Sequence, residues 1–444
     1  MFYLRNFKNF EEAELDYERP VSLLIGPNGA GKSNLIEAIE MLSFLANGRP
    51  LHEITDYGRE GGLEVRGGLD ACASYGEKSF TLGHRSVIET PAGPKEACYE
   101  ISIRVGKDPR IIQESLSIEG RATPIFEVLP SEGETTSADN QVRYDNNNKG
   151  GTKPTAAAAA DRSALSQYAR FASGNKKLSE TLQIIESVSQ ALGSPAVFDP
   201  IPRLMRNYER ETDTKLARNG SNISPVLRSL YRSSNRGLTI ILPKRKTLRR
   251  LIDLGTAERI LRRIKQLPDE PFDGFDFIET KAGDVMFGFK TKHEKKPIPA
   301  RVLSDGTLRA LAILAALETS PARQRLILEE FDNGVHPSRV HILSEALFDC
   351  AERNKLRVVA TTQNPATLNA LTDAQLDSVL FVVRQPGEKF ARLLPLKDLP
   401  GYIDFIEQGR LGDLVTRRVY ERHLAPDYEE ERIAETEKWL ESLP

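Results

Sequence analysis

The sequence has little of what marks membrane and secreted proteins. Its 444 residues include three cysteines and one tryptophan, and no apolar run reaches the roughly 18 residues that a membrane-spanning helix needs. Cys72, Cys98 and Cys350 lack the spacing of metal ligands and are too few for a disulfide framework. The chain also begins without the basic region and apolar core of a signal peptide. We therefore expect a protein of the reducing cytoplasm that does not contact a membrane.

The composition is that of a globular protein, but the charge is unevenly distributed. The chain is 39% hydrophobic and 28% charged, and it is long enough for two or three domains or for one domain with a large insertion. Its net charge is −2, yet residues 203–265 hold 17 Lys or Arg against 5 Asp or Glu. Such a segment could face any of four partners: the phosphates of a nucleic acid, an acidic protein surface, the acidic C-terminal tail of a second copy, or solvent alone. The cations expected on one helical face are Arg249, Arg250, Arg259, Arg262, Arg263 and Lys265.

Hydrophobic periodicity predicts an α/β fold. The first half has expected strands at 12–17 and 21–25, a helix at 31–45, and short strands at 79–88, 99–105, 115–118 and 124–129. These short strands predict an antiparallel β lobe, and the polar stretch 131–151 predicts a loose loop. Helices are expected from the alanine run 156–160 to about residue 266.

The second half predicts a parallel sheet with crossover helices. Its expected elements are strands at 275–279 and 284–289, a helix at 304–318, a strand at 325–329, a helix at 337–353, and strands at 356–361 and 378–383. We divide the chain into three consecutive parts. Residues 1–150 form the first half of the α/β domain, residues 151–275 form a basic, mostly helical insert, and residues 276–444 form the second half of the α/β domain with an acidic helical tail.

A glycine-rich loop follows the strand at 21–25. Gly26-Pro27-Asn28-Gly29-Ala30-Gly31-Lys32-Ser33 matches the phosphate-binding P-loop at every fixed position, between a strand and a helix as that motif requires. Its backbone N–H groups and the helix N-terminus favour phosphate oxygens. Lys32 is expected to reach the β- and γ-phosphates of ATP, and Ser33 to bind Mg²⁺ through its hydroxyl.

Two carboxylates end an apolar strand farther along the chain. Leu326-Ile327-Leu328-Glu329-Glu330 places acid at the carboxyl edge of a sheet, where ligands of such folds bind. We expect Glu329 to hold the Mg²⁺ shell and Glu330 to polarise the attacking water. The polar break Leu303-Ser304-Asp305-Gly306-Thr307, which opens an apolar helix, lies between the P-loop and these acids.

Together these motifs resemble those of the ABC-type ATPases of the RecF, SMC and overcoming-lysogenization-defect group, in its bacterial AAA-family branch. The residues that carry the resemblance are Asn6-Phe7-Lys8-Asn9-Phe10, residues 26–33, residues 303–309, Glu329-Glu330-Phe331-Asp332-Asn333-Gly334-Val335-His336-Pro337, Thr361-Thr362-Gln363-Asn364-Pro365 and Gly409-Arg410-Leu411-Gly412-Asp413-Leu414. They cover both ends of the chain, whereas the middle carries no motif of the group.

The resemblance implies an ABC-type head, a mixed sheet with an antiparallel β lobe, that binds ATP and Mg²⁺. The expected nucleotide contacts are Asn28, Gly29, Ala30, Gly31, Lys32, Ser33 and Asn34 at the phosphates and Asn6 and Lys8 near the base and ribose. Ser304 and Gly306 are expected to contact the γ-phosphate held by a second copy, and the 332–336 loop with His336 to cross that dimer interface. A homodimer or higher oligomer follows from this arrangement.

One position departs from the group's pattern. The group usually has Thr-Thr-His-Ser with a histidine that senses the γ-phosphate, and this chain has Gln363 there. Glutamine donates a hydrogen bond but cannot take up a proton. With Glu330, Lys32 and Gln363 as the expected catalytic set, we expect slow hydrolysis that suits a switch.

The resemblance leaves three functions open. The first is a nucleotide-gated dimeric clamp or sensor, the ATPase subunit of a bacterial anti-phage defence system that controls a separate effector protein. The second is a RecF-like repair or recombination ATPase whose 203–265 segment binds duplex DNA. The third is a scaffold that holds ATP without hydrolysing it.

Overall fold

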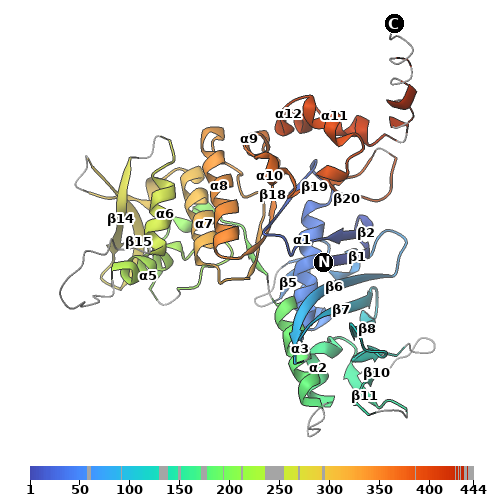
Figure 1. The fold of residues 1–444 in the computed structure, drawn as a ribbon. Helices are drawn as coiled ribbons and strands as arrows, with labels where there is room; N and C mark the ends of the chain where they lie inside the picture. The colour runs from blue at the N-terminus through green and yellow to red at the C-terminus, as the bar shows by residue number, and fades with distance from the viewer. Residues whose placement is uncertain are drawn as a thin grey trace, which may run out of the picture. The chain divides into compact units, whose positions relative to one another are not determined.

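The chain folds into two compact units in a computed structural model (Figure 1). Unit 1 comprises Met1–Glu18, Gly26–Pro195 and Phe381–Leu394, and unit 2 comprises Arg19–Ile25, Ala196–Leu380 and Pro395–Pro444. The structure describes residues 1–57, 62–91, 93–129, 139–148, 152–171, 178–193, 195–211, 214–235, 255–268, 271–292, 296–385, 387–425, 427–428, 430, 432–434 and 438. The units are interleaved along the sequence, and the three consecutive domains expected from the motifs stay a prediction.

Unit 1 contains an antiparallel sheet of eight strands in the order β11-β10-β9-β8-β7-β6-β1-β2. The strands are β1 (Phe2–Phe7), β2 (Phe10–Leu15), β6 (Ser79–Thr90), β7 (Gly93–Arg104), β8 (Arg110–Ile118), β9 (Phe126–Val128), β10 (Asp139–Tyr144) and β11 (Thr155–Ala159). Phe2 pairs with Leu15 on one side and His84 on the other, so β1 is a central strand. This sheet confirms the expected antiparallel β lobe.

The alanine run at 156–160 was expected to start a helix, and that expectation is wrong. Residues Thr155–Ala159 form the edge strand β11, in which Ala158 pairs with Asn140 of β10. Five alanines are too few to nucleate a helix alone, whereas the edge of β10 offers unpaired backbone groups to the segment. The helix α2 (Ala164–Phe171) begins later, where the buried carboxylate of Glu114 accepts the N–H groups of Ala164 (2.7 Å) and Leu165 (2.9 Å).

Helices cover the sheet of unit 1. They are α1 (Lys32–Ala46), α2, α3 (Ser179–Leu192) and the short η1 (Leu51–Glu53) and η2 (Leu69–Ala71), next to the two-stranded pair β4 (Ile54–Thr55) and β5 (Leu63–Glu64). The helix α1 packs against β1, β5, β6 and α3. Its buried Leu35, Ile36 and Leu42 anchor it there.

A second sheet has the order β12-β17-β18-β3-β19-β20. Its strands are β12 (Ala196–Phe198), β17 (Arg325–Leu328), β18 (Arg357–Thr361), β3 (Val21–Ile25), β19 (Val379–Val383) and β20 (Arg392–Pro395). The first four pair in parallel, and every residue of β3 and β19 is buried, as in a parallel sheet covered on both faces. The helix α8 (Pro337–Arg353) connects β17 to β18 and packs against α7 (Asp305–Thr319).

Unit 2 also contains a small antiparallel sheet and further helices. Its remaining elements are α4 (Pro202–Met205), β13 (Glu209–Arg210), α5 (Ile223–Asn235), α6 (Thr256–Ile264), β14 (Phe272–Glu279), β15 (Asp284–Thr291), β16 (Ile298–Pro299), η4 (Ala300–Val302), α9 (Pro365–Asn369), α10 (Asp373–Leu376), η5 (Leu396–Asp398), α11 (Tyr402–Glu407), α12 (Leu411–Thr416) and α13 (Val419–His423). In Figure 1, α5 and α6 adjoin β14 and β15, and α6 also packs against α7. No described helix is long and apolar enough to cross a membrane.

The three cysteines differ in their surroundings. Cys72 and Cys350 are buried, and burial raises the pKa of each thiol to about 12. Cys98 on β7 is half-buried.

Candidate functional site

The P-loop connects the end of β3 to the start of α1, and its glycines adopt backbone conformations that other residues avoid. Gly26, Gly29 and Gly31 have φ angles of 147°, 77° and 120°, in the region that glycine alone enters without steric cost. A Cβ on Gly31 would lie 2.6 Å from Nδ2 of Asn9, and one on Gly26 would clash with the carbonyl of Val382. Glycine at these positions therefore lets the loop take this path without backbone strain or clash.

Lys32 points back along the loop. Its Nζ donates to the carbonyls of Gly26 (2.7 Å) and Pro27 (3.1 Å), and the residue is 7% exposed. Ser33 and Asn34 occupy the first turn of α1 and are half-buried, Asn28 and Gly29 are exposed, and Ala30 is buried. The structure thus brings the predicted P-loop residues together around one loop.

Asn9, which sequence reasoning did not single out as a site residue, braces this loop. Its Nδ2 donates to the carbonyl of Ala30 at 2.7 Å, its Oδ1 accepts from Nδ2 of Asn34 at 2.7 Å, and its carbonyl accepts from N–H of Ala391 at 2.7 Å. Asn9 lies in the turn between β1 and β2, far from the P-loop in sequence. Its place within the quoted Asn6-Phe7-Lys8-Asn9-Phe10 motif was the only available signal.

A cavity of about 410 Å³ adjoins Asn9 in unit 1 and is rich in cations. Its lining residues are Lys8, Asn9, Asn34, Arg66, Ala71, Ala73, Tyr75, Arg384, Lys389 and Phe390. Glu37 pairs with both Lys8 and Arg66, and Lys389 lies 4.7 Å from the ring centroid of Phe390. Of the two residues predicted near the base and ribose, Lys8 lines this cavity. Asn6 does not line it, and its carbonyl accepts from N–H of Ser74 at 2.9 Å.

In unit 2, Glu329 and Glu330 follow the end of β17. Glu330 is exposed, with a left-handed φ of 43°, and its N–H donates to Oγ1 of Thr361 at 2.8 Å. Its Oε1 accepts from Nε2 of Gln363 and its Oε2 from Nδ2 of Asn333, both at 3.0 Å. Glu329 is half-buried. The predicted Glu330 and Gln363 are therefore in direct contact.

Asp332 fixes the loop that follows these acids. It is 2% exposed, and it accepts from Oγ1 of Thr362 at 2.6 Å and from Oγ1 of Thr367. Burial raises the pKa of Asp332 despite these hydrogen bonds. The 332–336 loop is thus tied to the segment that carries Gln363.

The polar break at 303–307 begins α7 as expected. Ser304 caps the helix, since its Oγ accepts from N–H of Thr307 at 3.1 Å. A Cβ on Gly306 would lie 2.8 Å from the carbonyl of Gly334, so the first turn of α7 fits closely against the 332–336 loop. His336 caps α8, and its Nδ1 accepts from N–H of Ser338 at 3.3 Å.

Comparison with known proteins identifies the family. Residues 21–369 match the family model described as "AAA domain, putative AbiEii toxin, Type IV TA system". The match extends over most of the chain and includes the P-loop, the break at 303–307, the paired acids and Gln363. The chain belongs to this AAA-domain family. ATP and Mg²⁺ are the general cofactors of such ATPases.

Two RecF proteins match a shorter part of this chain. The DNA replication and repair protein RecF of Picosynechococcus sp. is 35% identical over 80 residues, 18% of this chain and 20% of that protein. RecF of Brucella abortus is 39% identical over 85 residues, 18% of this chain and 21% of that protein. The AAA-domain chain thus matches about a fifth of the length of these relatives. The expected kinship with RecF is confirmed at this level.

Solved structures of SMC heads are also similar. An SMC head bound to the C-winged helix domain of ScpA shares 12% identity with a TM-score of 0.45, over 88% of this chain and 96% of that chain. The SMC head domain from Thermotoga maritima shares 13% identity with a TM-score of 0.39, over 89% of this chain and 97% of that chain.

Arg206 is a second residue of this AAA-domain chain that sequence reasoning missed. Its Nη2 donates to the carbonyl of Leu303 at 2.8 Å and pairs with Oδ1 of Asp305 at 2.5 Å. Arg206 therefore braces the break that begins α7, although it belongs to the basic 203–265 segment. No local pattern marks it, because its partners lie about 100 residues away.

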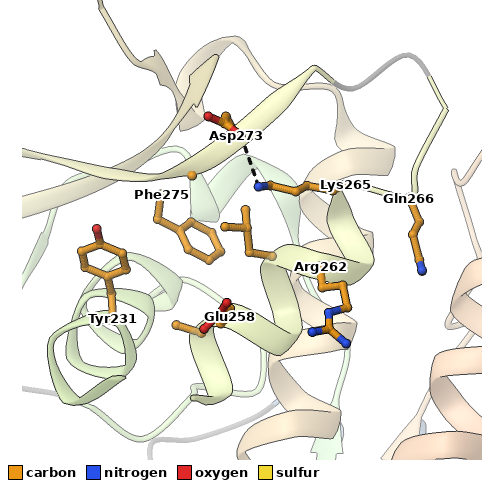
Figure 2. A pocket seen from close by; sticks show the side chains of 10 residues that line it. Tyr231, Glu258, Arg262, Lys265, Gln266, Asp273 and Phe275 are labelled. Carbon is orange, nitrogen blue, oxygen red and sulfur yellow. Dashed lines mark hydrogen bonds and ion pairs between the residues drawn. The ribbon is translucent and has the colours of Figure 1, made fainter. Parts of the chain in front are cut away.

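Several cations of the basic segment are engaged inside unit 2. Arg259 pairs with Glu318 (2.8 Å), and Arg263 with Asp349 (2.7 Å). Lys265 pairs with Asp273 at 3.3 Å, beside a cavity of about 730 Å³ (Figure 2). Tyr231 of α5, Arg262 of α6 and Phe275 of β14 also line this cavity. Arg249 and Arg250 lie outside the described residues.

Proposed function

We propose that this chain binds and hydrolyses ATP and works as a nucleotide-gated dimeric clamp or sensor that controls a separate effector protein in the cytoplasm. The single observation that carries the proposal is the P-loop, whose left-handed glycines and inward Lys32 join β3 to α1. Family membership and the order of the motifs support it.

The phosphates of ATP would occupy the P-loop. Backbone N–H groups between Asn28 and Ser33 and the start of α1 supply donors, and Lys32 exchanges its carbonyl partners for the β- and γ-phosphates. Mg²⁺ would supply Lewis acidity at the phosphates, held by the Ser33 hydroxyl and Glu329. The cavity lined by Lys8 and Asn9 adjoins the same loop and suits the ribose and base.

Glu330 is the proposed group that polarises the attacking water. It is exposed at the carboxyl end of β17, and its carboxylate is oriented by the amides of Gln363 and Asn333. Because Gln363 cannot carry a proton, it stabilises developing charge less than the usual histidine would. Slow turnover follows, which suits a protein that signals by its bound nucleotide.

A second copy would complete each site. Ser304 and Gly306 at the start of α7 and the 332–336 loop with His336 are the proposed contacts to the γ-phosphate held by the partner copy. The N-terminus of a 15-residue helix carries partial positive charge, which favours an anion there. We propose a role in anti-phage defence, in which the engaged dimer and its release control the effector.

Direct binding of duplex DNA is the second candidate, and the RecF relatives favour it. The ion pairs of Arg259, Arg263 and Lys265 count against it, because these cations already have acidic partners. A duplex affinity that falls steeply with salt and rises with ATP would favour RecF-like repair.

Two substitutions test the proposed chemistry. Lys32→Ala should weaken ATP binding by about 100-fold or more, since the central cation at the phosphates is lost. Glu330→Gln should keep ATP binding and lower steady-state phosphate release by at least about 100-fold. ATP titration by calorimetry and a phosphate-release assay measure these effects.

Glu352→Gln, which changes an exposed acid of α8, is the matched control and should behave like the wild type. Full ATP affinity in Lys32→Ala would refute the P-loop assignment. Unchanged phosphate release in Glu330→Gln would refute the assigned role of Glu330, and an absence of turnover in the wild type would leave the scaffold function.

A further inference from the structure

Asn333 contacts Glu330 at two points. Its backbone N–H donates to the carbonyl of Glu330 at 2.8 Å, and its Nδ2 donates to Oε2 of the same residue at 3.0 Å. Asn333 stands three residues after Glu330, in the tight turn that follows β17. It lies within the 332–336 loop expected at the dimer interface, but it is not among the individually predicted site residues.

The backbone of Glu330 is held in an unfavourable conformation. Its φ of 43° is left-handed, which is costly for a residue with a side chain and persists only where the surroundings impose it. Thr361, 3% exposed, accepts the N–H of Glu330 through Oγ1, while Asn333 binds its carbonyl. These two bonds hold the backbone of Glu330 in this conformation.

Hydrogen bonds, rather than packing, orient the carboxylate itself. Glu330, Asn333 and Gln363 are all exposed, so burial contributes little to holding the carboxyl group. One oxygen accepts from Gln363 and the other from Asn333. A carboxylate has about four acceptor positions, so two donors fix its plane and leave room for a water on each oxygen.

We infer that Asn333 is a positioning residue for hydrolysis, acting through Glu330. This inference rests on the proposed function, because it gives a partner to the group that polarises the water. The Asn333 amide donates to Oε2 and restricts the rotation of the carboxylate. Gln363 donates to the other oxygen, Oε1, and therefore cannot replace the bond that Asn333 makes to Oε2.

The position of Asn333 also links Glu330 to the 332–336 loop. Gly334, the next residue, lies against Gly306 in the first turn of α7. A partner copy that contacts this loop would shift the Asn333 amide relative to Oε2. Engagement of two copies would then be sensed at the carboxylate without any partner residue touching it.

Two substitutions of Asn333 separate positioning from a merely structural role. Asn333→Ala removes the amide donor, and we expect kcat to fall about tenfold. Asn333→Asp keeps the shape but puts a second carboxylate against Glu330, and we expect a fall on the order of 100-fold. Both variants keep the backbone bond, so the KM and the calorimetric Kd for ATP should stay within about twofold of the wild type.

Which of the two substitutions lowers kcat more distinguishes a positioning role of Asn333 from a structural one. A structural role predicts that the isosteric Asn333→Asp is the milder change, whereas positioning through a donated hydrogen bond predicts that it is the more severe. Gln266→Glu, an exposed amide-to-acid change next to Lys265 and outside the proposed site, is the matched control and should leave kcat unchanged. Added to Glu330→Gln, Asn333→Asp should lower the residual rate no further.

A milder effect of Asn333→Asp than of Asn333→Ala, or a wild-type kcat in both, overturns the inference. Such a result leaves the proposed function intact as long as Glu330→Gln abolishes turnover. Unchanged turnover in Glu330→Gln removes the proposed function itself, so the two failures are distinguishable.

Discussion

Gly412 lies where the C-terminal motif meets helix α9. Its N–H donates to Oδ1 of Asn369 at 2.7 Å, and Nδ2 of Asn369 donates to Oδ1 of Asp413 at 3.1 Å. A Cβ at position 412 would clash with the carbonyl of Pro365. Since α9 begins two residues after Gln363, this contact holds the segment that carries Gln363.

Gly412→Ala should therefore destabilise the protein. The added methyl group meets backbone atoms that cannot move aside, and we expect a loss of about 1–3 kcal/mol in the free energy of unfolding. Urea denaturation followed by circular dichroism measures the change. Gly274→Ala, where a Cβ meets nothing within 4 Å, is the control and should change stability little. Equal stability of both variants would show that α12 and α9 are not tightly packed.

The residues found from sequence and those missed differ in the range of their interactions. Lys32 and Ser304 belong to continuous motifs whose geometry is local, so both could be placed before the structure was known. Asn9 and Arg206 act on segments that are distant in sequence, and only the tertiary fold reveals them. The contact between Gln363 and Glu330 likewise depends on β17 and β18 being neighbours.

At the scale of elements, one carboxylate joins three helices. Glu318 of α7, with a side chain 3% exposed, pairs with Arg259 of α6 at 2.8 Å and Arg353 of α8 at 2.7 Å. Burial opposes the ionisation of Glu318, but hydrogen bonds from Arg353 and Arg259 outweigh burial and lower its pKa. Arg259, which belongs to the basic 203–265 segment, thus has a structural role.

This pairing predicts a pH dependence of stability. Because the folded pKa of Glu318 is lowered, its stabilising contribution is fully present above the unfolded pKa of about 4.3 and is lost as pH falls further through the lower folded pKa. Glu318→Gln should cost about 2 kcal/mol at pH 7, since both arginines are partly exposed. Urea denaturation of both proteins at several pH values should show the difference shrinking as pH falls below about 4. A difference that stays constant would mean that the ion pairs contribute nothing.

The alanine run shows why element type is harder to predict than element position. The helix propensity of alanine favours a helix. The run is short, however, and it pairs instead with the free edge of β10. Other elements were easier to predict, because buried β3 and β19 and the long apolar α7 have unambiguous patterns.

At the scale of the whole molecule, the proposed dimer gives the sharpest test. Ser304→Arg should leave ATP binding by the single subunit intact, because Ser304 is no part of the P-loop. It should abolish ATP-dependent dimerisation, since a long cationic side chain would occupy the position where the partner's γ-phosphate must meet α7. Size-exclusion chromatography with ATP in the Glu330→Gln background measures this.

Ser233→Arg, at an exposed position of α5, introduces the same side chain elsewhere and should dimerise normally. Dimers of unchanged size in Ser304→Arg would rule out the arrangement in which a second copy completes each site.

The sequence predicted an α/β head with a β lobe, but it did not predict how the chain divides into units. The chain passes from unit 2 to unit 1 between Ile25 and Gly26, within the strand–loop–helix motif.

The three thiols give the protein a built-in handle for spectroscopy. Cys72 and Cys350 are buried and, with pKa values raised to about 12, carry almost no reactive thiolate at neutral pH. Cys98, half-buried on β7, is therefore the thiol that a maleimide dye should reach first. One fluorophore per chain, attached without any engineered cysteine, would report from unit 1 on the proposed engagement of two copies.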